Sequence, residues 1–350
     1  MSTSSYKCPN CGGGLKFDPE LQKSKCEYCS SEFTEAELEE TSRTMEEKAS
    51  GSGSTEDGEN RALKGYVCNN CGAEVVTEET TSATFCYYCH EPVLLTDRLV
   101  GEFKPTKIIP FAYDRDKAVE SFLSWAKSRR FVPKEFYSAS QLEKITGIYI
   151  PYWMADVKAD IDYSGVGTNI RIWRAGDVEY TEHSEYKIER QGVVDVDNIN
   201  EVAMRKIDKG LLDSISPYDE SKAVDFSMSY LSGFFAEKYD IPKAEVQPAI
   251  EGRAKEYTSV LVKETIGSYN MVSMNRSDVS ISVKGWDYTL LPAWILTYKY
   301  KGKTYIYAVN GQNGKSYGEL PVDGKKLGLT SGIAAAAMFV FALIGGLLIW

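Results

Sequence analysis

Three patterns in this sequence of 350 residues predict an α+β fold with small cysteine-rich modules. Four cysteines recur twice at the same spacing, strand-like alternation surrounds segments of helical periodicity, and the last 22 residues carry no charge. We therefore expect two small zinc ribbons with four cysteine ligands each, a mixed α+β body with an antiparallel sheet, and one C-terminal transmembrane helix.

Shifts in composition divide the chain into six parts. They are zinc ribbon 1 at 1–33, an acidic helix and flexible linker at 34–64, zinc ribbon 2 at 65–97, the α+β body at 98–321, a juxtamembrane linker at 322–328 and the transmembrane helix at 329–350. The linker prediction depends on the Gly- and Ser-rich run at 49–60, which is typical of flexible chain.

The cysteines indicate bound metal. Each set reads C-x2-C, fourteen residues, C-x2-C, and two such turns suit the tetrahedral coordination of Zn²⁺ by four thiolates. The expected ligands of two structural zinc ions are Cys8, Cys11, Cys26 and Cys29 for the first and Cys68, Cys71, Cys86 and Cys89 for the second. Glycines follow the leading turn in both copies, where a positive φ is expected. Four thiolates leave no open position, so neither ion is expected to be catalytic.

Disulfides in an exported module are the alternative use of these cysteines. The N-terminus has no apolar signal segment, so we expect a reducing compartment, the cytosol, for the two modules. His90 follows Cys89 and could replace a ligand, but a complete cysteine set favours a solvated loop histidine.

The charge balance argues against a large non-specific nucleic-acid surface. Acidic residues number 50 against 40 basic ones, the net charge is −10, and 65–97 contain no Lys or Arg. The first ribbon carries four lysines that we expect to be solvated: Lys7, Lys16, Lys23 and Lys25.

Periodicity predicts the elements of the body. Helices are expected at about 114–130, 198–212, 220–239 and 243–265, with Asp114 as an N-cap. Strands are expected at 148–163, at 168–191 as a meander, and at 269–283, 289–300 and 304–309. The runs Ile150-Pro151-Tyr152-Trp153 and Leu291-Pro292-Ala293-Trp294 are alike, which indicates two related strands.

The uncharged segment 329–350 would form a helix about 33 Å long, enough for a hydrocarbon core of about 30 Å. A buried helix of the body is the alternative. Lys325 and Lys326 precede the segment and no basic residue follows it, so the positive-inside rule predicts a tail-anchored, single-pass protein of the cell membrane, with its N-terminal domains in the cytoplasm.

No motif supports catalysis. Gly302-Lys303-Thr304 lacks the leading glycine of a phosphate loop, and His183 lies in a charged run that is typical of a surface. The acidic residues are too numerous for the sequence to single out a catalytic pair, so a hydrolase built on the body is a weaker alternative. We expect no catalytic or cofactor-binding residues beyond the zinc ligands, and no enzyme activity.

The start of the chain, Tyr6 to Gly13 with Leu21 to Cys29, resembles the transcription-factor-IIB-type zinc ribbons of bacterial proteins. With Ile109-Pro110-Phe111, the run Ile148 to Trp153 and the C-terminal segment, nearly the whole chain is similar to a family of membrane-anchored ribbon proteins. Members are often labelled primosomal replication factor Y, a superfamily II helicase, by similarity. Others, the YdjG-like proteins, are linked with phage-shock-type and flotillin-like membrane-stress proteins. Because the helicase's phosphate loop and motor domains are missing, only the ribbon part of that label could apply.

Two functions follow as expectations. The first is a non-enzymatic membrane-anchored adaptor, which binds protein partners at the cytoplasmic membrane face and, by resemblance, serves a membrane-stress response. The second is a zinc-ribbon protein that binds nucleic acid in replication or transcription, which the negative charge disfavours.

Overall fold

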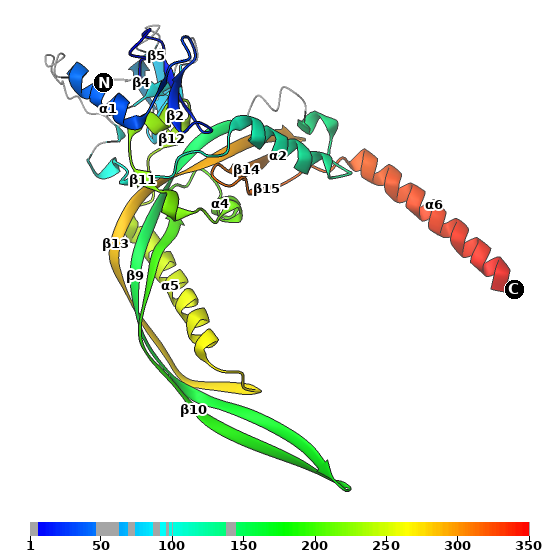
Figure 1. Ribbon diagram of the computed structural model, residues 1–350. Helices are drawn as coiled ribbons and strands as arrows, with labels where there is room; N and C mark the ends of the chain where they lie inside the picture. Colours follow the sequence, from blue (N-terminus) through cyan, green and yellow to red (C-terminus); the bar gives the residue numbers. More distant parts are fainter. Residues whose placement is uncertain are drawn as a thin grey trace.

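The computed structural model describes residues 6–46, 63–68, 74–86, 92–95, 98–99, 101–137 and 145–349. These residues form a mixed, sheet-rich α+β fold (Figure 1). The expected flexible linker at 49–60 and the loop histidine His90 lie outside the described residues.

The first cysteine module is a small antiparallel sheet followed by a helix. Strands β1 (Leu15–Asp18), β2 (Lys23–Cys26) and β3 (Glu32–Phe33) pair in that order, and α1 (Glu35–Glu46) comes next. Thr34 begins the helix, because its N–H and its hydroxyl both donate to the Glu37 carboxylate. The acidic helix expected after the first ribbon is therefore confirmed.

The body is built on one mixed sheet of ten strands. Seven follow the order β11–β8–β13–β9–β12–β6–β7, β10 pairs with β9, and β14 pairs with β13 and β15. Their bounds are β6 (Thr81–Phe85), β7 (Pro92–Leu94), β8 (Lys107–Ile108), β9 (Thr146–Ala175), β10 (Val178–Val202), β11 (Val224–Asp225), β12 (Phe235–Glu237), β13 (Met271–Tyr300), β14 (Lys303–Asn310) and β15 (Ser316–Gly318). A separate hairpin of β4 (Leu63–Val67) and β5 (Glu74–Glu78) precedes β6. Because β6 pairs with β12, the second cysteine module is tied into the sheet of the body.

Three α-helices pack on this sheet: α2 (Arg115–Lys127), α4 (Lys209–Ile215) and α5 (Lys243–Thr265). Short 3₁₀ turns lie before and between these helices, at η2 (Gly101–Phe103), η3 (Lys134–Tyr137), η4 (Glu220–Lys222) and η5 (Met228–Leu231). The N-cap expected at Asp114 is confirmed, since its carboxylate accepts the Lys117 N–H at 2.7 Å. The helix expected at 243–265 is confirmed by α5.

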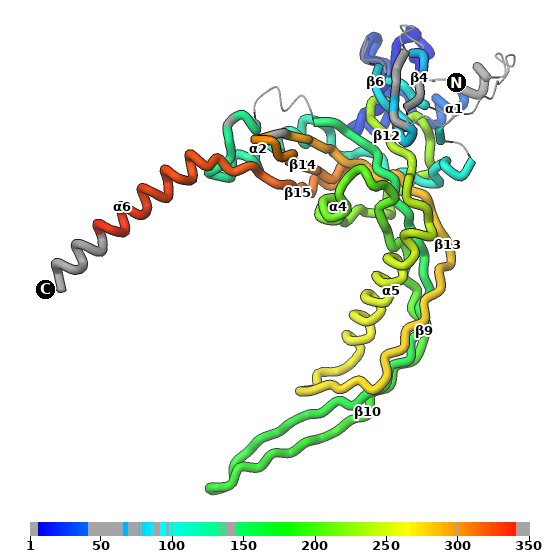
Figure 2. Tube along the Cα trace, turned by 180° about the vertical axis from the view of Figure 1, so that it is seen from behind, coloured from blue at the N-terminus to red at the C-terminus, as the bar shows by residue number. Residues whose placement is uncertain are grey.

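Three long strands extend the fold beyond its core. β9 and β13 have 30 residues each, so each extends about 100 Å. With β10 they form a curved ribbon in the order β10–β9–β13, and α5 lies on its concave side (Figures 1 and 2). We call residues 158–195 together with 271–282 the arm. Residues 169–184, beyond the end of β13, are its tip.

The predicted meander at 168–191 is instead part of one long hairpin. The strands expected at 269–283 and 289–300 are likewise continuous, because two register shifts in β13, at Met274/Arg276 and Val283/Gly285, absorb the irregular pairing. The two similar runs of the sequence are direct neighbours: Leu291 lies opposite Ile150. They meet where the ribbon enters the core, in which the Phe111 and Phe234 rings stack with centroids 4.2 Å apart.

Two expected helices are wrong. The segment 220–239 forms η4, β11, η5 and β12, and within 198–212 only the start of α4 is helical. Leu231, at the end of η5, and Phe234, after it, are both buried in the main core without an α-helix, so tertiary packing overrode the helical spacing of these apolar residues.

The expected membrane anchor is also wrong. The chain does form a C-terminal helix, α6 (Gly324–Ile349), but none of the helices that the structure describes is both long enough and apolar enough to span a membrane. Two lysines occupy its first turn and Thr330 and Ser331 follow, so the start of this helix is polar. The assignments of 322–328 as a juxtamembrane linker and 329–350 as a transmembrane helix, and the tail-anchored, single-pass location in the cell membrane, lose their support.

Candidate metal centre

The first cysteine quartet is assembled in space. The sulfur atoms of Cys8, Cys11, Cys26 and Cys29 all lie within 4.8 Å of one another. Cys8 Sγ is 3.5 Å from Cys29 Sγ, and Cys11 Sγ is 3.5 Å from Cys26 Sγ. None of the four is in a disulfide. The chain thus brings together the four residues that the spacing predicted.

Two matching backbone turns position these sulfurs. In the first, the Cys8 N–H donates to Gly13 O at 2.7 Å and the Gly12 N–H donates to Cys8 O. In the second, the Cys26 N–H donates to Ser31 O at 2.9 Å and the Ser30 N–H donates to Cys26 O. The fourth residue after each leading cysteine has a positive φ, +75° at Gly12 and +60° at Ser30. The sequence predicted the first of these and missed the second, because serine does not signal this conformation.

The donor set fits a tetrahedral thiolate site. Four sulfurs at about 2.3 Å from one Zn²⁺ would stand about 3.8 Å apart, whereas a disulfide bond requires about 2.0 Å. The observed separations of 3.5 Å and up to 4.8 Å bracket the tetrahedral value. These four residues could therefore hold one metal ion, with no position left for a substrate.

Electrostatics within the quartet also favour a bound cation. The hydroxyl of Ser31, 3.2 Å from Cys29 Sγ, is the main reason why the pKa of the Cys29 thiol falls to about 6. A backbone hydrogen bond with Gly13 lowers the pKa of the Cys11 thiol, but the neighbouring sulfurs of Cys29 and Cys26 raise it to about 12. The neighbouring sulfurs therefore oppose the ionisation of Cys11 but not that of Cys29, and a shared cation would favour the thiolate form of both.

The first module is fastened to the body by several different contacts. The Phe17 N–H donates to Ser232 O at 2.9 Å, and the Phe17 ring meets the Tyr230 ring with centroids 5.1 Å apart. Gln22 Nε2 donates to Phe111 O at 2.7 Å. Phe17 is 6% exposed and belongs to the main core of the body. The metal site is therefore attached to the sheet through the strand that follows its first turn.

The second quartet is described only in part. Cys68 and Cys86 are buried beside each other in a small cluster with Tyr66, Val93 and Leu95. Cys71 and Cys89 lie outside the described residues. Arg98 Nε donates to the Tyr66 hydroxyl at 2.6 Å and Nη1 donates to Thr81 O at 2.7 Å, which ties this cluster to β6.

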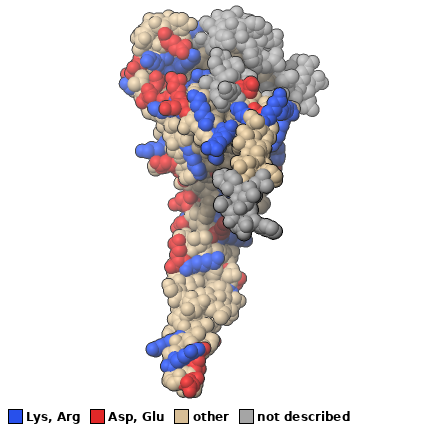
Figure 3. All heavy atoms as spheres, turned by 90° about the vertical axis from the view of Figure 1, so that its right-hand side faces the viewer, with Lys and Arg blue, Asp and Glu red and all other residues tan. Residues whose placement is uncertain are grey.

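Two of the four lysines of the first module are paired with acids. Lys16 bonds Glu27 at 2.7 Å and Lys23 lies 3.7 Å from Glu32. Figure 3 shows Lys and Arg side chains close together across the upper middle of the face that it draws, with Asp and Glu side chains beside them. His183, the one candidate for a catalytic triad, is exposed on β10, as expected for a surface residue.

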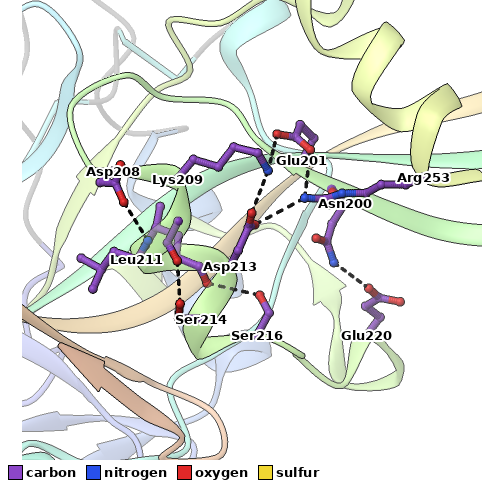
Figure 4. Close-up of polar contacts among 12 residues, drawn as sticks. Asn200, Glu201, Asp208, Lys209, Leu211, Asp213, Ser214, Ser216, Glu220 and Arg253 are labelled. Atoms are coloured by element: carbon purple, nitrogen blue, oxygen red, sulfur yellow. Dashed lines mark hydrogen bonds and ion pairs between the residues drawn. The ribbon is translucent and has the colours of Figure 1, made fainter. Parts of the chain in front are cut away.

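An ionic cluster around one buried carboxylate, at the end of β10, was not predicted from the sequence (Figure 4). The Glu201 side chain, 6% exposed, bonds Lys209 at 2.7 Å and Arg253 at 3.2 Å. Both cations also reach Asp213, at 2.9 and 3.4 Å. The cluster joins β10, α4 and α5. Charged residues are usually exposed, so only the fold could show that Glu201 is buried.

Comparisons with known proteins give one informative match. The uncharacterised protein YdjG of Bacillus subtilis (strain 168) is 32% identical over 344 residues, which covers 97% of this chain and 97% of that protein. No family model matches the chain. No solved structure matches it either.

Proposed function

The chain belongs to the same family as YdjG of Bacillus subtilis, and we propose that it is a non-enzymatic, zinc-stabilised adaptor that binds other proteins through its arm. The relative is uncharacterised, so the proposal depends on the geometry of this chain.

The observation that carries the proposal is the arm tip. There the ribbon has only two strands, which bury little and are marginally stable on their own in water. Four large apolar side chains of the tip are 41% to 60% exposed: Ile172, Trp173, Val178 and Tyr180. The Trp173 and Tyr180 rings stack with centroids 5.5 Å apart. Exposed aromatic clusters at the end of a projecting element are typical of protein-binding surfaces.

We assign zinc to the metal centre because soft thiolates in a tetrahedral set select it. We propose that the first quartet forms a zinc ribbon, and that Cys68, Cys71, Cys86 and Cys89 hold a second ion in the same way. Both ions are structural in this proposal. Metal analysis of the full chain should give about two zinc ions, and Cys8→Ser with Cys26→Ser should remove one of them. A chain that binds no zinc would contradict the assignment.

Nucleic-acid binding receives less support. The net charge is −10, and two lysines of the first module form ion pairs with acidic neighbours. We therefore do not extend the proposal to DNA or RNA.

Affinity purification of the full chain at native expression level tests the adaptor proposal. A stoichiometric protein partner, other than a second copy of this chain, should be recovered and should bind the purified chain. The double variant Ile172→Ser, Trp173→Ser should weaken that binding at least about tenfold, because it removes apolar area from the tip. Tyr317→Ser, an equally exposed aromatic on β15, is the matched control and should bind normally. Equal binding by the tip variant would overturn the proposal.

A further inference from the structure

Strand β10 has a long unpaired edge. Along Val178–Asp195 it pairs with β9 on one side, and no other strand in the described part of the chain pairs with it on the opposite side. Helix α5 packs on the face of the ribbon, through Ile250 and Ala254. Natural edge strands avoid pairing through a proline, a bulge, a cover or charged side chains, and the open segment of β10 has only the charges. The nearest irregularity here is a register shift after Val196, beyond the open segment.

The hairpin geometry shows which backbone groups face outward. Gly176 and Asp177 form a two-residue turn between Ala175 and Val178, and residues that flank such a turn bond each other. Even-numbered residues of β10 therefore bond β9, and odd-numbered ones direct their N–H and C=O groups to the open edge. The hydrogen bonds of β9 alternate in the same way, because the N–H of Ile170, which lies opposite the odd-numbered His183, points away from β10 and donates to Asn270.

The charged side chains along this edge favour one register for the pairing of β10 with β10 of a second copy. Suppose that two copies of β10 run antiparallel with Tyr186 opposite Tyr186. Glu185 then faces the second copy's Lys187, and Lys187 faces its Glu185. His183 faces Glu189 in the same manner. Moving the two-fold axis by one residue would instead set Lys187 against Lys187 or Glu185 against Glu185.

These side chains are available for such pairing. Lys187 is 74% exposed and Glu189 is 59% exposed, and they bond each other within the strand at 2.5 Å. An exposed pair of this kind is worth little and exchanges easily for a cross-strand partner.

Gly192 is a second, independent sign of a close neighbour. A Cβ atom there would meet nothing within 4 Å, so the fold of the single chain does not require a glycine. Glycine weakens a strand interior, and one in an extended strand often marks the approach of another chain. In the register centred on Tyr186, Gly192 lies opposite Tyr180 of the second copy, and the missing side chain leaves room for the phenol ring.

We propose that β10 pairs with β10 of a second copy of this chain, antiparallel about a two-fold axis at Tyr186. The two arms then form one continuous sheet of six strands, with the bodies at opposite ends. This pairing uses the edge of β10, whereas the proposed partner surface depends on Ile172 and Trp173 of β9.

Sedimentation of the full chain over a range of concentrations tests this pairing. The wild-type chain should be a dimer that Glu185→Lys weakens at least about tenfold, because two attractive cross-strand pairs become repulsive. The double variant Glu185→Lys, Lys187→Glu restores opposite charges and should dimerise like the wild type. Gly192→Thr should fold normally and dimerise more weakly, since its side chain would occupy the space of Tyr180.

Cross-linking tests the register. Tyr186→Cys places two sulfurs across the axis in a non-hydrogen-bonded pair, so mild oxidation should link two chains. Tyr180→Cys is the control, because its two copies would lie about 40 Å apart and should not link above the level of the wild-type cysteines.

A monomer at all concentrations, a dimer indifferent to Glu185→Lys, or equal linking of the two cysteine variants would overturn the pairing. If the double variant Ile172→Ser, Trp173→Ser loses partner binding but still dimerises like the wild type, partner binding and dimerisation are separate properties. That result would support both proposals.

Discussion

Single residues contribute to this fold in two contrasting ways. The eight cysteines repeat at a spacing that only a few structures require, and the four of the first set meet as that spacing predicts. Glu201 has no such signature, yet it is buried between Lys209 and Arg253. Its burial depends on where β10, α4 and α5 meet. That meeting joins residues far apart in the chain, such as Glu201 and Arg253, which are 52 positions apart.

Glu201→Gln tests the buried cluster. The amide keeps the shape of the carboxylate but leaves both cations without their buried counter-charge, so the free energy of unfolding should fall by about 1–3 kcal/mol. Because Lys209 is partly exposed, this loss of stability is smaller than for a fully buried ion pair. Urea unfolding measures the change. Glu256→Gln, at an exposed position of α5, is the control and should change stability by less than about 0.5 kcal/mol. Equal stability of the two variants would contradict the assigned role.

Elements were predicted well where a local signal sets their ends and poorly where it does not. Asp114 begins α2 and the bounds of α5 agree with the sequence pattern, because capping and helical periodicity act within one turn. The segment 220–239 has the same apolar spacing but no α-helix, since its short strands β11 and β12 pair with β8 and with β6 and β9. Local propensity is weaker than these long-range bonds.

The arm should be sensitive to one glycine of β9. A Cβ at Gly165 would lie 2.4 Å from the Ser273 carbonyl oxygen, beside the register shift at Met274/Arg276. Gly165→Ala should therefore destabilise the pairing of β9 with β13 by about 1–3 kcal/mol, seen as faster amide exchange along the arm. Gly285→Ala, where a Cβ meets nothing within 4 Å, should leave exchange nearly unchanged. The prediction fails if both variants exchange at the same rate.

At the scale of the whole molecule, the metal centre and the body form one packed unit. Phe17 carries the contact, because it follows the first cysteine turn and is buried in the main core. The remote arm is instead held by long strands and by α5 on one face. Loss of metal should therefore disturb one end of the molecule and not the other.

Zinc removal by a strong chelator should expose residues 6–33 to proteolysis while β9, β13 and α5 stay protected. The thiolates lose the ion that holds their two turns together, whereas the ribbon has its own hydrogen bonds and core. Limited proteolysis with mass mapping measures this. Phe17→Ala should give the same cleavage pattern with zinc still bound, since it removes the docking contact and not a ligand. Protection of 6–33 after complete zinc removal would contradict the structural role.

Sequence alone determined the first cysteine quartet, the α+β class, the strong helices and the strand character of the ribbon, because each of these follows from spacing or periodicity over a few residues. It failed on the membrane anchor, where an uncharged run was counted as one apolar span, and on the helices of 198–239. Only the tertiary structure decided that the first cysteine module docks on the body through Phe17, that Glu201 is buried, and that β9 and β10 form one long hairpin with an open edge. These features depend on which distant residues meet, and the free energy of those contacts is not encoded in any local pattern.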